Sequence, residues 1–438
     1  MELRGKRVLV AGLGVSGLAA AKLLSRRGAT LLLWDEREDI ARESPPGELH
    51  LGRELPSLEH VELLVVSPGI PANAPIMRAA RAARIPIIGE IELASRFIRA
   101  PIVAITGTNG KSTVTALTGE IFKAAGLRTF VGGNLGTPLS EAVDGEYDIL
   151  VVEASSYQLE TIEWFRPRVA VHLNLAEDHL DRHADFAEYA AAKARLFENQ
   201  WPDDWAILNR DDARVWDLAV RVRARVLGFG AAPAERPPAI WTEGGAIAFD
   251  DGERRERIAL VGFRLPGAHN ASNAMAAAAA ALALDVAPAT IEQALRGFRG
   301  LPHRIELIRE KNGVAFVDDS KGTNVAAAVE AIAAARGPVI LIAGGVDKGG
   351  SYEPLRAAIA RRARLVVLIG AAREKMAAAL AGAAPLESRL TLSEAVELAA
   401  ERARAGDTVL LSPACSSLDQ FKNYAERGRV FQELVRAL

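Results

Sequence analysis

The stretch that decides the fold is residues 101–122, PIVAITGTNGKSTVTALTGEIF. An apolar run, a glycine turn and a helical pattern follow one another there, which is typical of a phosphate-binding loop between a buried strand and a helix. The usual P-loop spacing, G-x-x-x-x-G-K-[ST], requires a first glycine at position 105, where this chain has Ile105. The chain instead has a loop two residues shorter, Gly107-Thr108-Asn109-Gly110-Lys111-Ser112-Thr113. We therefore predict an ATP site of a particular P-loop branch.

The composition of the 438 residues bounds the class of protein. With 53 basic and 55 acidic residues the net charge is −2, which favours neither a nucleic-acid partner nor a membrane surface. The single cysteine, Cys415, excludes an internal disulfide and a cysteine-based zinc site, and it fits a reducing compartment. The sequence begins without an apolar signal segment, and the longest uncharged apolar run, 274–284, is too short to span a bilayer. We expect a soluble cytoplasmic protein.

The order of the expected elements indicates an α/β fold with three domains. Short apolar runs alternate with helical patterns over the first hundred residues, which predicts βαβ units around a parallel sheet. Within the second α/β pattern, residues 225–265 consist of short pieces with Pro and Gly, which we predict to be a small antiparallel appendage. The predicted domains are a Rossmann-like domain at 1–98, a central P-loop domain at 99–300 and a Rossmann-like C-terminal domain at 301–438.

A second glycine loop opens the chain. Residues 12–17, GLGVSG, match G-x-G-x-x-G after a predicted strand, and Asp35 ends the next strand, where a ribose-binding acid is expected. Taken alone, this pattern favours an NAD-dependent oxidoreductase. Its physical content is less specific, because glycines that bring the backbone close to a pyrophosphate suit any nucleotide diphosphate, and a glycine turn without a ligand is also compatible.

Polar residues follow the expected strands of the middle domain. Glu153 follows the run DILVV, and His179 follows VAVHLNLAED. A buried carboxylate needs a partner, so we predict that Glu153 binds Mg²⁺ and that His179 contributes to a metal or phosphate site. Lys193 lies among alanines in FAEYAAAKARLF, which suggests partial burial, although a solvent-exposed helix face is the simpler interpretation from the residues alone.

The third domain repeats this arrangement, because polar loops follow its expected strands, where α/β sheets bind ligands. These loops are 318–323 (DDSKGT), 345–348 (GVDK) and 412–424 (SPACSSLDQFKNY). Cys415 lies in the last loop and is expected to be a small buried thiol rather than a nucleophile.

Several motifs together resemble the Mur ligases of peptidoglycan synthesis. They are GTNGKST, EASSYQLE, EDHLDRH, the lysine of YAAAKARLF, HNASNAMAA, GLPHRIE, DDSKGTN and SPACSSLDQFKNY, and they cover all three predicted domains. GTNGKST alone is shared with folylpolyglutamate synthases, so the combination carries the resemblance. Order and spacing look most like the member that adds D-glutamate to UDP-N-acetylmuramoyl-L-alanine.

The resemblance implies a reaction. Family members use ATP to phosphorylate a substrate carboxylate, and an amine then attacks the acyl phosphate. It implies two Mg²⁺ ions, a carbamylated Lys193 whose new carboxylate assists the second ion, and the UDP-linked substrate and D-glutamate as partners. We expect a monomer, with neither a nucleic-acid partner nor membrane insertion. It also turns the first glycine loop into a UDP site.

Residue by residue, the resemblance implies the following roles. Lys111, Glu153, His179 and Lys193 would be catalytic, and the metal shell would comprise Ser112, Glu153, His179 and Lys193. ATP would contact Gly107, Thr108, Asn109, Gly110, Lys111, Ser112, Thr113, Asn273, Arg304 and Asp319, with Asn270 a weaker neighbour. The UDP-linked substrate would contact Val15, Ser16, Asp35, Ser67, Gly69, Asn134 and His179, with Glu36 close by. D-Glutamate would contact Lys321, Thr323, Lys348, Ser417, Leu418 and Tyr424.

Two positions depart from the family pattern, and three other functions stay open. The family often has Phe at Tyr424 and Thr at Glu36, and an acidic side chain beside UDP puts the second contact in doubt. The alternatives are a sister ligase for another amino acid, an NAD-dependent oxidoreductase, and a non-catalytic nucleotide switch. The oxidoreductase gives GTNGKST no role, and the switch leaves Lys193 and the third domain unexplained.

Overall fold

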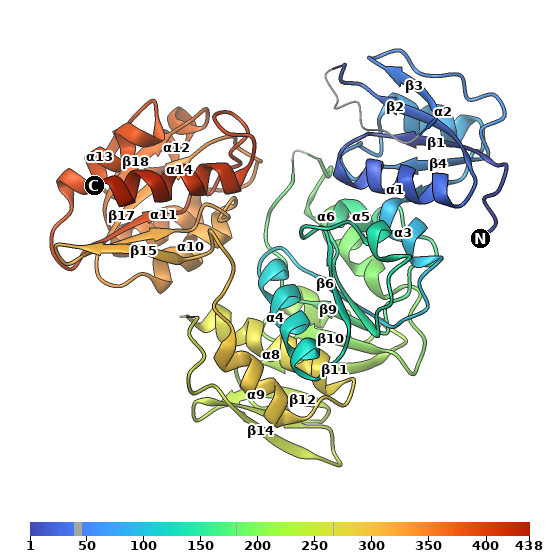
Figure 1. Ribbon diagram of the computed structural model, residues 1–438. Helices are drawn as coiled ribbons and strands as arrows, with labels where there is room; N and C mark the ends of the chain where they lie inside the picture. The colour runs from blue at the N-terminus through green and yellow to red at the C-terminus, as the bar shows by residue number, and fades with distance from the viewer. Residues whose placement is uncertain (39–45, 181, 266) are drawn as a thin grey trace. The chain divides into compact units, whose positions relative to one another are not determined.

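The computed structural model describes residues 1–38, 46–180, 182–265 and 267–438, and in these ranges the strands form three sheets of five, nine and six strands. The residues divide into two compact units. The first unit comprises 1–175, 187–263 and 272–298 and contains the first two sheets; the second comprises 176–186, 264–271 and 299–438 and contains the third. Figure 1 draws the three sheets in blue, in light blue to yellow-green, and in gold to red.

The first sheet is parallel and has helices on both faces. Its elements are β1 (Arg7–Ala11), α1 (Val15–Arg26), β2 (Thr30–Asp35), β3 (Glu48–Leu51), β4 (Leu63–Val66), α2 (Pro75–Ala82), β5 (Ile87–Gly89) and α3 (Glu90–Ser95). Its strand order, β3-β2-β1-β4-β5, is that of a Rossmann-like fold. Because side chains alternate along a strand, Val8 and Val10 pack with α1 and α3, whereas Leu9 and Ala11 pack with α2.

The second sheet is parallel over most of its width. Its strands are β6 (Ile102–Thr106), β7 (Thr129–Gly133), β8 (Ile149–Glu153), β9 (Val169–His172), β10 (Trp205–Asn209), β11 (Arg225–Gly230), β12 (Ala239–Glu243), β13 (Ala246–Asp250) and β14 (Arg255–Ala259). The order is β14-β13-β12-β11-β10-β9-β6-β8-β7. The antiparallel strands expected in 225–265 are present as β12 to β14, which extend the edge of the large sheet beyond β11, and β11 itself joins that sheet in parallel.

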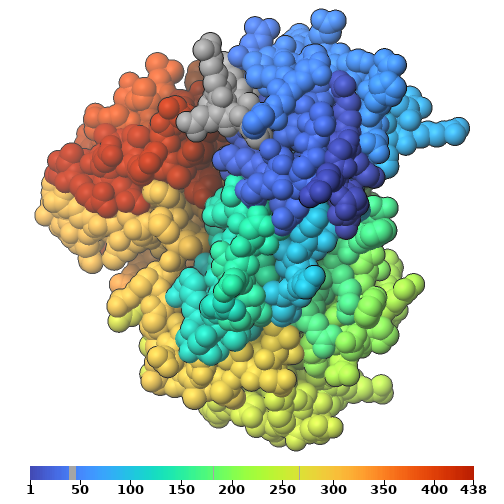
Figure 2. Space-filling model, turned by 45° about the vertical axis from the view of Figure 1, so that its right-hand side comes forward, coloured from blue at the N-terminus to red at the C-terminus, as the bar shows by residue number. Residues whose placement is uncertain are grey.

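Helices flank this sheet and position its loops. They are α4 (Lys111–Ala124), η1 (Leu139–Ala142), α5 (Ser156–Leu159), α6 (Phe186–Ala194), η2 (Arg195–Phe197), α7 (Ala213–Trp216), α8 (Ala268–Leu282) and α9 (Pro288–Gly297). Helix α4 packs against α9, and the two lie side by side both in Figure 1 and in the space-filling view of Figure 2. Among the described residues, no helix is both long and apolar enough to cross a membrane.

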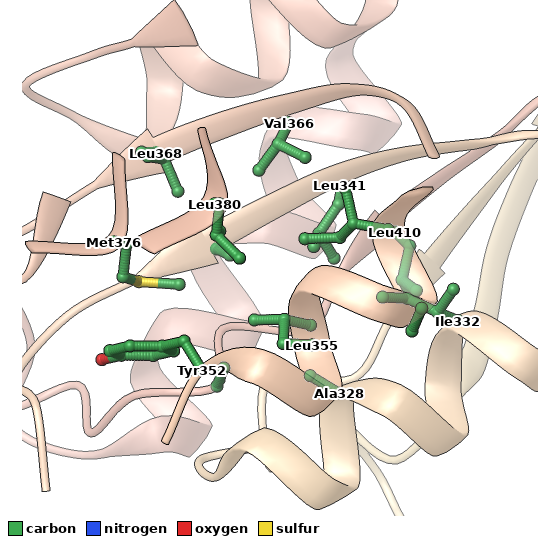
Figure 3. Close-up of a cluster of buried hydrophobic side chains, with 14 of the residues drawn as sticks. Ala328, Ile332, Leu341, Tyr352, Leu355, Val366, Leu368, Met376, Leu380 and Leu410 are labelled. Carbon is green, nitrogen blue, oxygen red and sulfur yellow. The ribbon is translucent and has the colours of Figure 1, made fainter. Parts of the chain in front are cut away.

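The third sheet carries the loops of the second unit. Its elements are β15 (Glu306–Lys311), β16 (Val314–Asp318), α10 (Val325–Ala334), β17 (Val339–Gly344), α11 (Glu353–Arg362), β18 (Ala363–Ile369), α12 (Arg373–Leu380), β19 (Leu386–Ser388), α13 (Leu392–Arg402), β20 (Thr408–Leu411) and α14 (Tyr424–Ala437). The order is β15-β16-β20-β17-β18-β19, parallel except at β15. Figure 3 shows Leu341 and Leu410 of the sheet packed with Ile332 and Leu355 of the covering helices. The carboxyl ends of β16, β17 and β20 therefore meet at one edge.

Candidate active site

The loop after β1 has the backbone geometry of a phosphate-binding turn. Gly12 has a φ of 84°, a left-handed value that favours glycine. A Cβ on Gly17 would lie 1.7 Å from the Gly12 carbonyl oxygen, so the chain requires glycine there as well. Gly14 precedes α1 without a side-chain cap, which leaves the first N–H groups of the helix available to a ligand.

Asp35, the last residue of β2, supports this loop from behind. Its carboxylate accepts hydrogen bonds from the Leu13 N–H at 2.7 Å, from the Arg37 N–H at 3.0 Å and from the Arg37 guanidinium at 3.1 Å. Burial raises the pKa of Asp35, but the hydrogen bonds from Arg37 and Leu13 outweigh burial and lower it overall. The predicted ribose-binding acid therefore lies at the loop in its ionised form.

Most of the predicted UDP contacts gather at this end of the first sheet. Ser67 lies against the glycine loop, because a Cβ on Gly12 would be 2.8 Å from the Ser67 Cβ. Glu36, whose presence near UDP was unexpected, points to solvent and forms an exposed ion pair with Arg53 at 3.3 Å. The predicted contacts found at this end are Val15, Ser16, Asp35, Ser67 and Gly69.

The shortened loop joins β6 to α4 and is held by a residue that the sequence did not single out. Gly107 and Gly110 have φ values of 148° and 85°. Asn174, after β9, accepts from the Asn109 N–H at 2.8 Å and donates to the Asn109 carbonyl at 3.1 Å. Its own carbonyl accepts from the Thr108 N–H at 2.9 Å. Asn174 thus fixes the conformation of the loop from the neighbouring strand.

Two lysines meet at one carbonyl of this loop. The Lys111 Nζ donates to the carbonyls of Gly107 and Thr108, each at 2.8 Å, and the Lys193 Nζ donates to the same Gly107 oxygen at 2.8 Å. Lys193 is 2% exposed, which corrects the simpler expectation of a solvent-exposed helix face. Tyr189, four residues earlier on α6, lies under the Lys193 ammonium at 4.7 Å, and its hydroxyl is 3.0 Å from the Thr108 hydroxyl. This i, i+4 spacing is a sequence signal for Tyr189 that we did not use.

Oxygen ligands lie beside these cations. Glu153 ends β8, pairs in register with Ile105 of β6 and is buried, and the Asn134 amide donates to it at 2.6 Å. Thr113 is fully buried, and its hydroxyl has no hydrogen-bond partner among the described residues. A carboxylate, an unsatisfied hydroxyl and an uncapped helix start fit a nucleotide phosphate with a hard divalent cation. Asn134, predicted to contact UDP, therefore lies at the second sheet.

Asn273 is brought to the same loop from α8. A Cβ on Gly110 would lie 2.4 Å from the Asn273 Oδ1, so the amide is in direct contact with the glycine. This position agrees with a residue that faces the nucleotide. Asn270, the weaker candidate on the same helix, belongs to the second compact unit.

His172 lies beneath the loop, in β9, in register with Thr106 of β6. It is fully buried, its ring stacks near that of Phe197 with centroids 6.4 Å apart, and neither ring nitrogen has a hydrogen-bond partner among the described residues. Burial, followed by the charges of Lys193 and Lys111, lowers the pKa of His172 to about 3. The ring is therefore neutral, and no motif in the sequence marks His172.

In the second unit, Arg304 and Asp319 flank the end of β16. Arg304 lies between two residues with left-handed φ, His303 at 63° and Ile305 at 49°. Asp319 accepts from the Ser412 hydroxyl at 2.7 Å and from the Ile305 N–H at 3.3 Å. Burial raises the pKa of Asp319 to about 7 despite these hydrogen bonds.

The residues predicted to bind the amino acid converge at the same edge of the third sheet. The Lys348 Nζ lies 3.4 Å from the Thr323 hydroxyl and 3.3 Å from the carboxylate of Asp178. The Lys321 Nζ lies 3.1 Å from the Tyr424 hydroxyl and 4.6 Å from its ring centroid. The loop after β20 adds two further predicted contacts, the buried Ser417 and the exposed Leu418.

His179 belongs to the segment 176–186 of the second unit. It has a φ of 58°, and its Nε2 is 3.6 Å from the carboxylate of Asp178, which also accepts from the Asn324 amide at 3.0 Å. Glu153 and Lys193 belong to the first unit, so a metal shell shared with His179 stays a prediction.

Comparison with known families covers nearly the whole chain. Residues 6–89 match the model of the Mur ligase MurD-like N-terminal domain, 105–281 match the Mur ligase middle domain, and 303–415 match the Mur ligase glutamate ligase domain.

Relatives of known name extend this match. The UDP-N-acetylmuramoylalanine--D-glutamate ligase of Geobacter metallireducens is 48% identical over 448 residues, covering 100% of this chain and 99% of the relative. The ligase of the same name from Thermoanaerobacter sp. strain X514 is 42% identical over 452 residues, covering 100% of both.

Solved structures agree with the fold. A pseudomurein peptide ligase type C from Methanothermus fervidus has a TM-score of 0.61 at 20% identity and covers 99% of this chain and 100% of its own. The UDP-N-acetylmuramate-alanine ligase MurC of Thermotoga maritima has a TM-score of 0.60 at 16% identity, with 99% of each chain covered.

Proposed function

The chain belongs to the Mur ligase family, and we propose that it is the ATP-dependent ligase that joins D-glutamate to UDP-N-acetylmuramoyl-L-alanine. The observation that carries the proposal is the 48% identity, over the full chain, to a relative named for that reaction. The product is a precursor of peptidoglycan, so the enzyme acts in cell-wall synthesis. ATP and the UDP-linked substrate are cytoplasmic metabolites, and we place the reaction in the cytoplasm.

The reaction activates a carboxylate that is a poor electrophile at neutral pH. A carboxylate oxygen of the L-alanyl group attacks the γ-phosphorus of ATP, the bond from that phosphorus to the bridging oxygen breaks, and ADP leaves. The amine of D-glutamate then attacks the acyl carbon and loses a proton, and phosphate leaves, so that an amide, ADP and phosphate are formed. The protein mainly positions the reactants and neutralises charge.

The residues of the shortened loop are suited to hold the phosphates. Backbone N–H groups of residues 110–113, where α4 begins, provide donors for phosphate oxygens. Lys111 reaches the loop carbonyls at 2.8 Å, within range of a phosphate bound in the same turn. Asn273, Arg304 and Asp319 are assigned to the rest of the nucleotide.

The metal shell is assigned to Ser112, Glu153, His179 and the carbamate of Lys193, for two Mg²⁺ ions. When bound, Mg²⁺ neutralises the phosphate charge that develops during transfer. The burial of Lys193 supports its modification, because a carbamate would replace a buried ammonium by a carboxylate, a preferred ligand of a hard cation. Glu153, oriented by the Asn134 amide at 2.6 Å, presents a second carboxylate.

The amino-acid site is assigned to the edge of the third sheet. Lys321 and Lys348 supply positive charge for the two carboxylates of D-glutamate, and Thr323 and Ser417 supply hydroxyl groups. Leu418 and Tyr424 complete the set. A tyrosine at 424 keeps a ring there and adds a hydroxyl that lies 3.1 Å from the Lys321 ammonium.

The UDP-linked substrate is assigned to Val15, Ser16, Asp35, Ser67, Gly69, Asn134 and His179. We leave Glu36 out of this set, because its side chain is exposed and pairs with Arg53. We keep the division into domains at residues 98 and 300 as a proposal, and we propose that the enzyme is a monomer, which light scattering after size-exclusion chromatography would test.

The test is coupled ADP release with UDP-N-acetylmuramoyl-L-alanine and, separately, D-glutamate, L-glutamate, L-alanine or L-lysine. We expect turnover with D-glutamate alone. Turnover with another amino acid would keep the mechanism and indicate a sister ligase. ATP hydrolysis at a rate that does not depend on either substrate would contradict a ligase. A nicotinamide titration that shows no binding would exclude the oxidoreductase.

A further inference from the structure

The loop that carries Lys348 joins β17 to α11 and contains two glycine pairs with positive φ. The pair 344–345 has φ values of 122° and 135°, and the pair 349–350 has values of 78° and 91°. Glycine has the largest conformational freedom of any residue. The position of Lys348 therefore depends on the contacts made by residues 346–348, between the two pairs.

Asp347 provides one of these contacts. Its Oδ1 accepts a hydrogen bond from the Tyr352 hydroxyl at 2.7 Å, and its Oδ2 accepts one from the Lys375 ammonium at 2.5 Å. Burial raises the pKa of Asp347, but Lys375 and Tyr352 outweigh burial and lower it overall, so the carboxylate is ionised. The proposed reaction gives none of these three residues a role.

Tyr352 is itself firmly held. Its ring belongs to the apolar cluster of the third sheet, where Figure 3 shows it beside Leu355 and below Met376. Its hydroxyl also lies 3.5 Å from the sulfur of Cys415, two residues before Ser417. A buried ring with a polar end fixes that end in space. Tyr352 thus connects the Lys348 loop with the loop after β20.

A second connection runs through the backbone. The Val346 N–H donates to the Ser416 carbonyl at 2.8 Å, and the Ser416 N–H donates to the Val346 carbonyl at 2.9 Å. The two loops therefore form a short antiparallel bridge. Next to this bridge, Asp347 contacts Tyr352, which precedes α11, and Lys375 of α12. Lys348 instead contacts Thr323 and Asp178.

We propose that Asp347, held by Tyr352 and Lys375, is a positioning residue for the amino-acid site. It fixes Lys348 toward the bound amino acid and, through Val346, fixes the loop that carries Ser417. The inference rests on the proposed function, because that function makes Lys348 and Ser417 amino-acid contacts. Asp347 does not touch the substrate, so its loss weakens amino-acid binding and leaves phosphoryl transfer nearly intact.

The first test is steady-state kinetics of Asp347→Ala, Asp347→Asn, Lys375→Met and the control Glu353→Gln. Glu353 is an exposed acid at the start of α11, next to Tyr352, and its removal takes away one negative charge without touching Asp347. For Asp347→Ala we expect the KM for D-glutamate to rise about tenfold, with kcat and the KM for ATP changed less than threefold, since a change in KM alone reports lost binding. Asp347→Asn retains an acceptor for Tyr352 and restores part of the affinity. Lys375→Met gives a smaller rise, and the control gives none.

The second test does not depend on the substrate. Hydrogen–deuterium exchange of the full-length protein is followed in peptides covering 344–350 and 412–420. We expect Asp347→Ala, but not Glu353→Gln, to speed exchange in both peptides, because the Val346 and Ser416 N–H groups form the bridge.

The outcomes separate the two proposals. If Asp347→Ala speeds exchange in both peptides but the wild type does not turn over D-glutamate, the proposed function is overturned. The structural role of Asp347 in holding the two loops would still stand. Wild-type turnover with unchanged exchange, or an unchanged KM for D-glutamate in Asp347→Ala, would overturn the positioning role. A fall in kcat together with a similar rise in the KM of every substrate and a lower melting temperature would also overturn the positioning role, because these changes indicate a general structural effect.

Discussion

The two glycine-rich loops of the first unit both join the end of a parallel strand to the start of a helix, but the charges behind them differ in sign. Behind Gly12 and Gly17 lies the carboxylate of Asp35, which accepts the Leu13 N–H. Behind Gly107 lie the ammonium groups of Lys111 and Lys193, both donating to its carbonyl.

We propose that the two loops bind different nucleotides, and this difference in charge would select between them. Main-chain N–H groups at a helix start suit any phosphate, so the glycines alone do not select the ligand. A carboxylate behind the first loop disfavours additional phosphate charge and suits ribose hydroxyl groups. The Lys111 ammonium behind the second loop suits a triphosphate and the charge that develops when its γ-phosphoryl is transferred, and a carbamylated Lys193 would add a ligand for the accompanying Mg²⁺. Glycine spacing therefore identifies a nucleotide site, and the neighbouring side chains identify its chemistry.

The largest expected effect comes from removing a cation of the second loop. We expect Lys111→Met to lower kcat by about 10³-fold, because one preorganised donor to developing charge is worth on the order of 10²–10³ in rate. Coupled ADP release under saturating substrates measures the change. Lys123→Met is the control, because Lys123 lies on the same helix but is exposed and paired with Glu120. A kcat of Lys111→Met within tenfold of the wild-type value would contradict a catalytic role for the positive charge at the second loop.

The second variant removes Lys193, whose positively charged ammonium we expect to be converted into a negatively charged carbamate. We expect Lys193→Ala to lose about 10²-fold in kcat, and added acetate or formate to restore part of it, because a small carboxylate can occupy the place of the carbamate. Chloride at equal ionic strength is the control for a salt effect. A fully active Lys193→Ala enzyme would exclude the carbamate. Low activity with equal response to acetate and chloride would indicate that the ammonium, in contact with the Gly107 carbonyl, is the working form.

A third change separates the loops by substrate. A Cβ on Gly17 would meet the Gly12 carbonyl at 1.7 Å, and one on Gly110 would meet the Asn273 amide at 2.4 Å. We expect Gly17→Ala to raise the KM for the UDP-linked substrate at least about tenfold, and Gly110→Ala to do so for ATP, since each distorts its own loop. Gly297→Ala, where a Cβ meets nothing within 4 Å, is the control. A rise in both KM values for either loop variant would mean that the loops do not act independently.

The sequence predicted the strands and glycine loops of both sites because their signals are local. Buried parallel strands are continuous apolar runs, and glycines at left-handed positions cannot readily be replaced. The same locality explains the incomplete prediction for 225–265. Which strand pairs with which depends on contacts distant in sequence, so composition indicated antiparallel strands but not that they extend the large sheet.

The site could be predicted residue by residue only where a motif stood out. The burial of Lys193 was not evident from the residues, because a helix rich in alanine has little amphipathic contrast to mark its buried face. Asn174 and Tyr189 were missed, since both act by contacting the loop across the fold. Asp347 was noticed as a polar residue at a strand end, but its partners Tyr352 and Lys375 are known only from the structure.

The smallest expected effect on activity lies beneath the second loop, at His172. We expect His172→Phe to raise the free energy of unfolding by about 1 kcal/mol at pH 7.5. A buried polar group without a hydrogen-bond partner costs about 1–3 kcal/mol, and the variant regains only part of this because the larger phenyl ring packs less well in the same space. Stacking near Phe197 is retained. Urea denaturation measures the change, and activity should stay at the wild-type level.

The gain should grow as the pH falls. The native pKa of His172 is about 3, whereas an unfolded histidine has a pKa of about 6.5. Between these values the unfolded chain binds a proton that the native protein does not, so native stability falls by up to ~1.4 kcal/mol per pH unit as the pH drops below 6.5. His172→Phe removes this loss, because a phenylalanine at 172 binds no proton in either state. If His172→Phe is instead less stable or inactive, the ring nitrogens have a partner in the working enzyme. The difference between the two loops would then include an imidazole as well as two lysines.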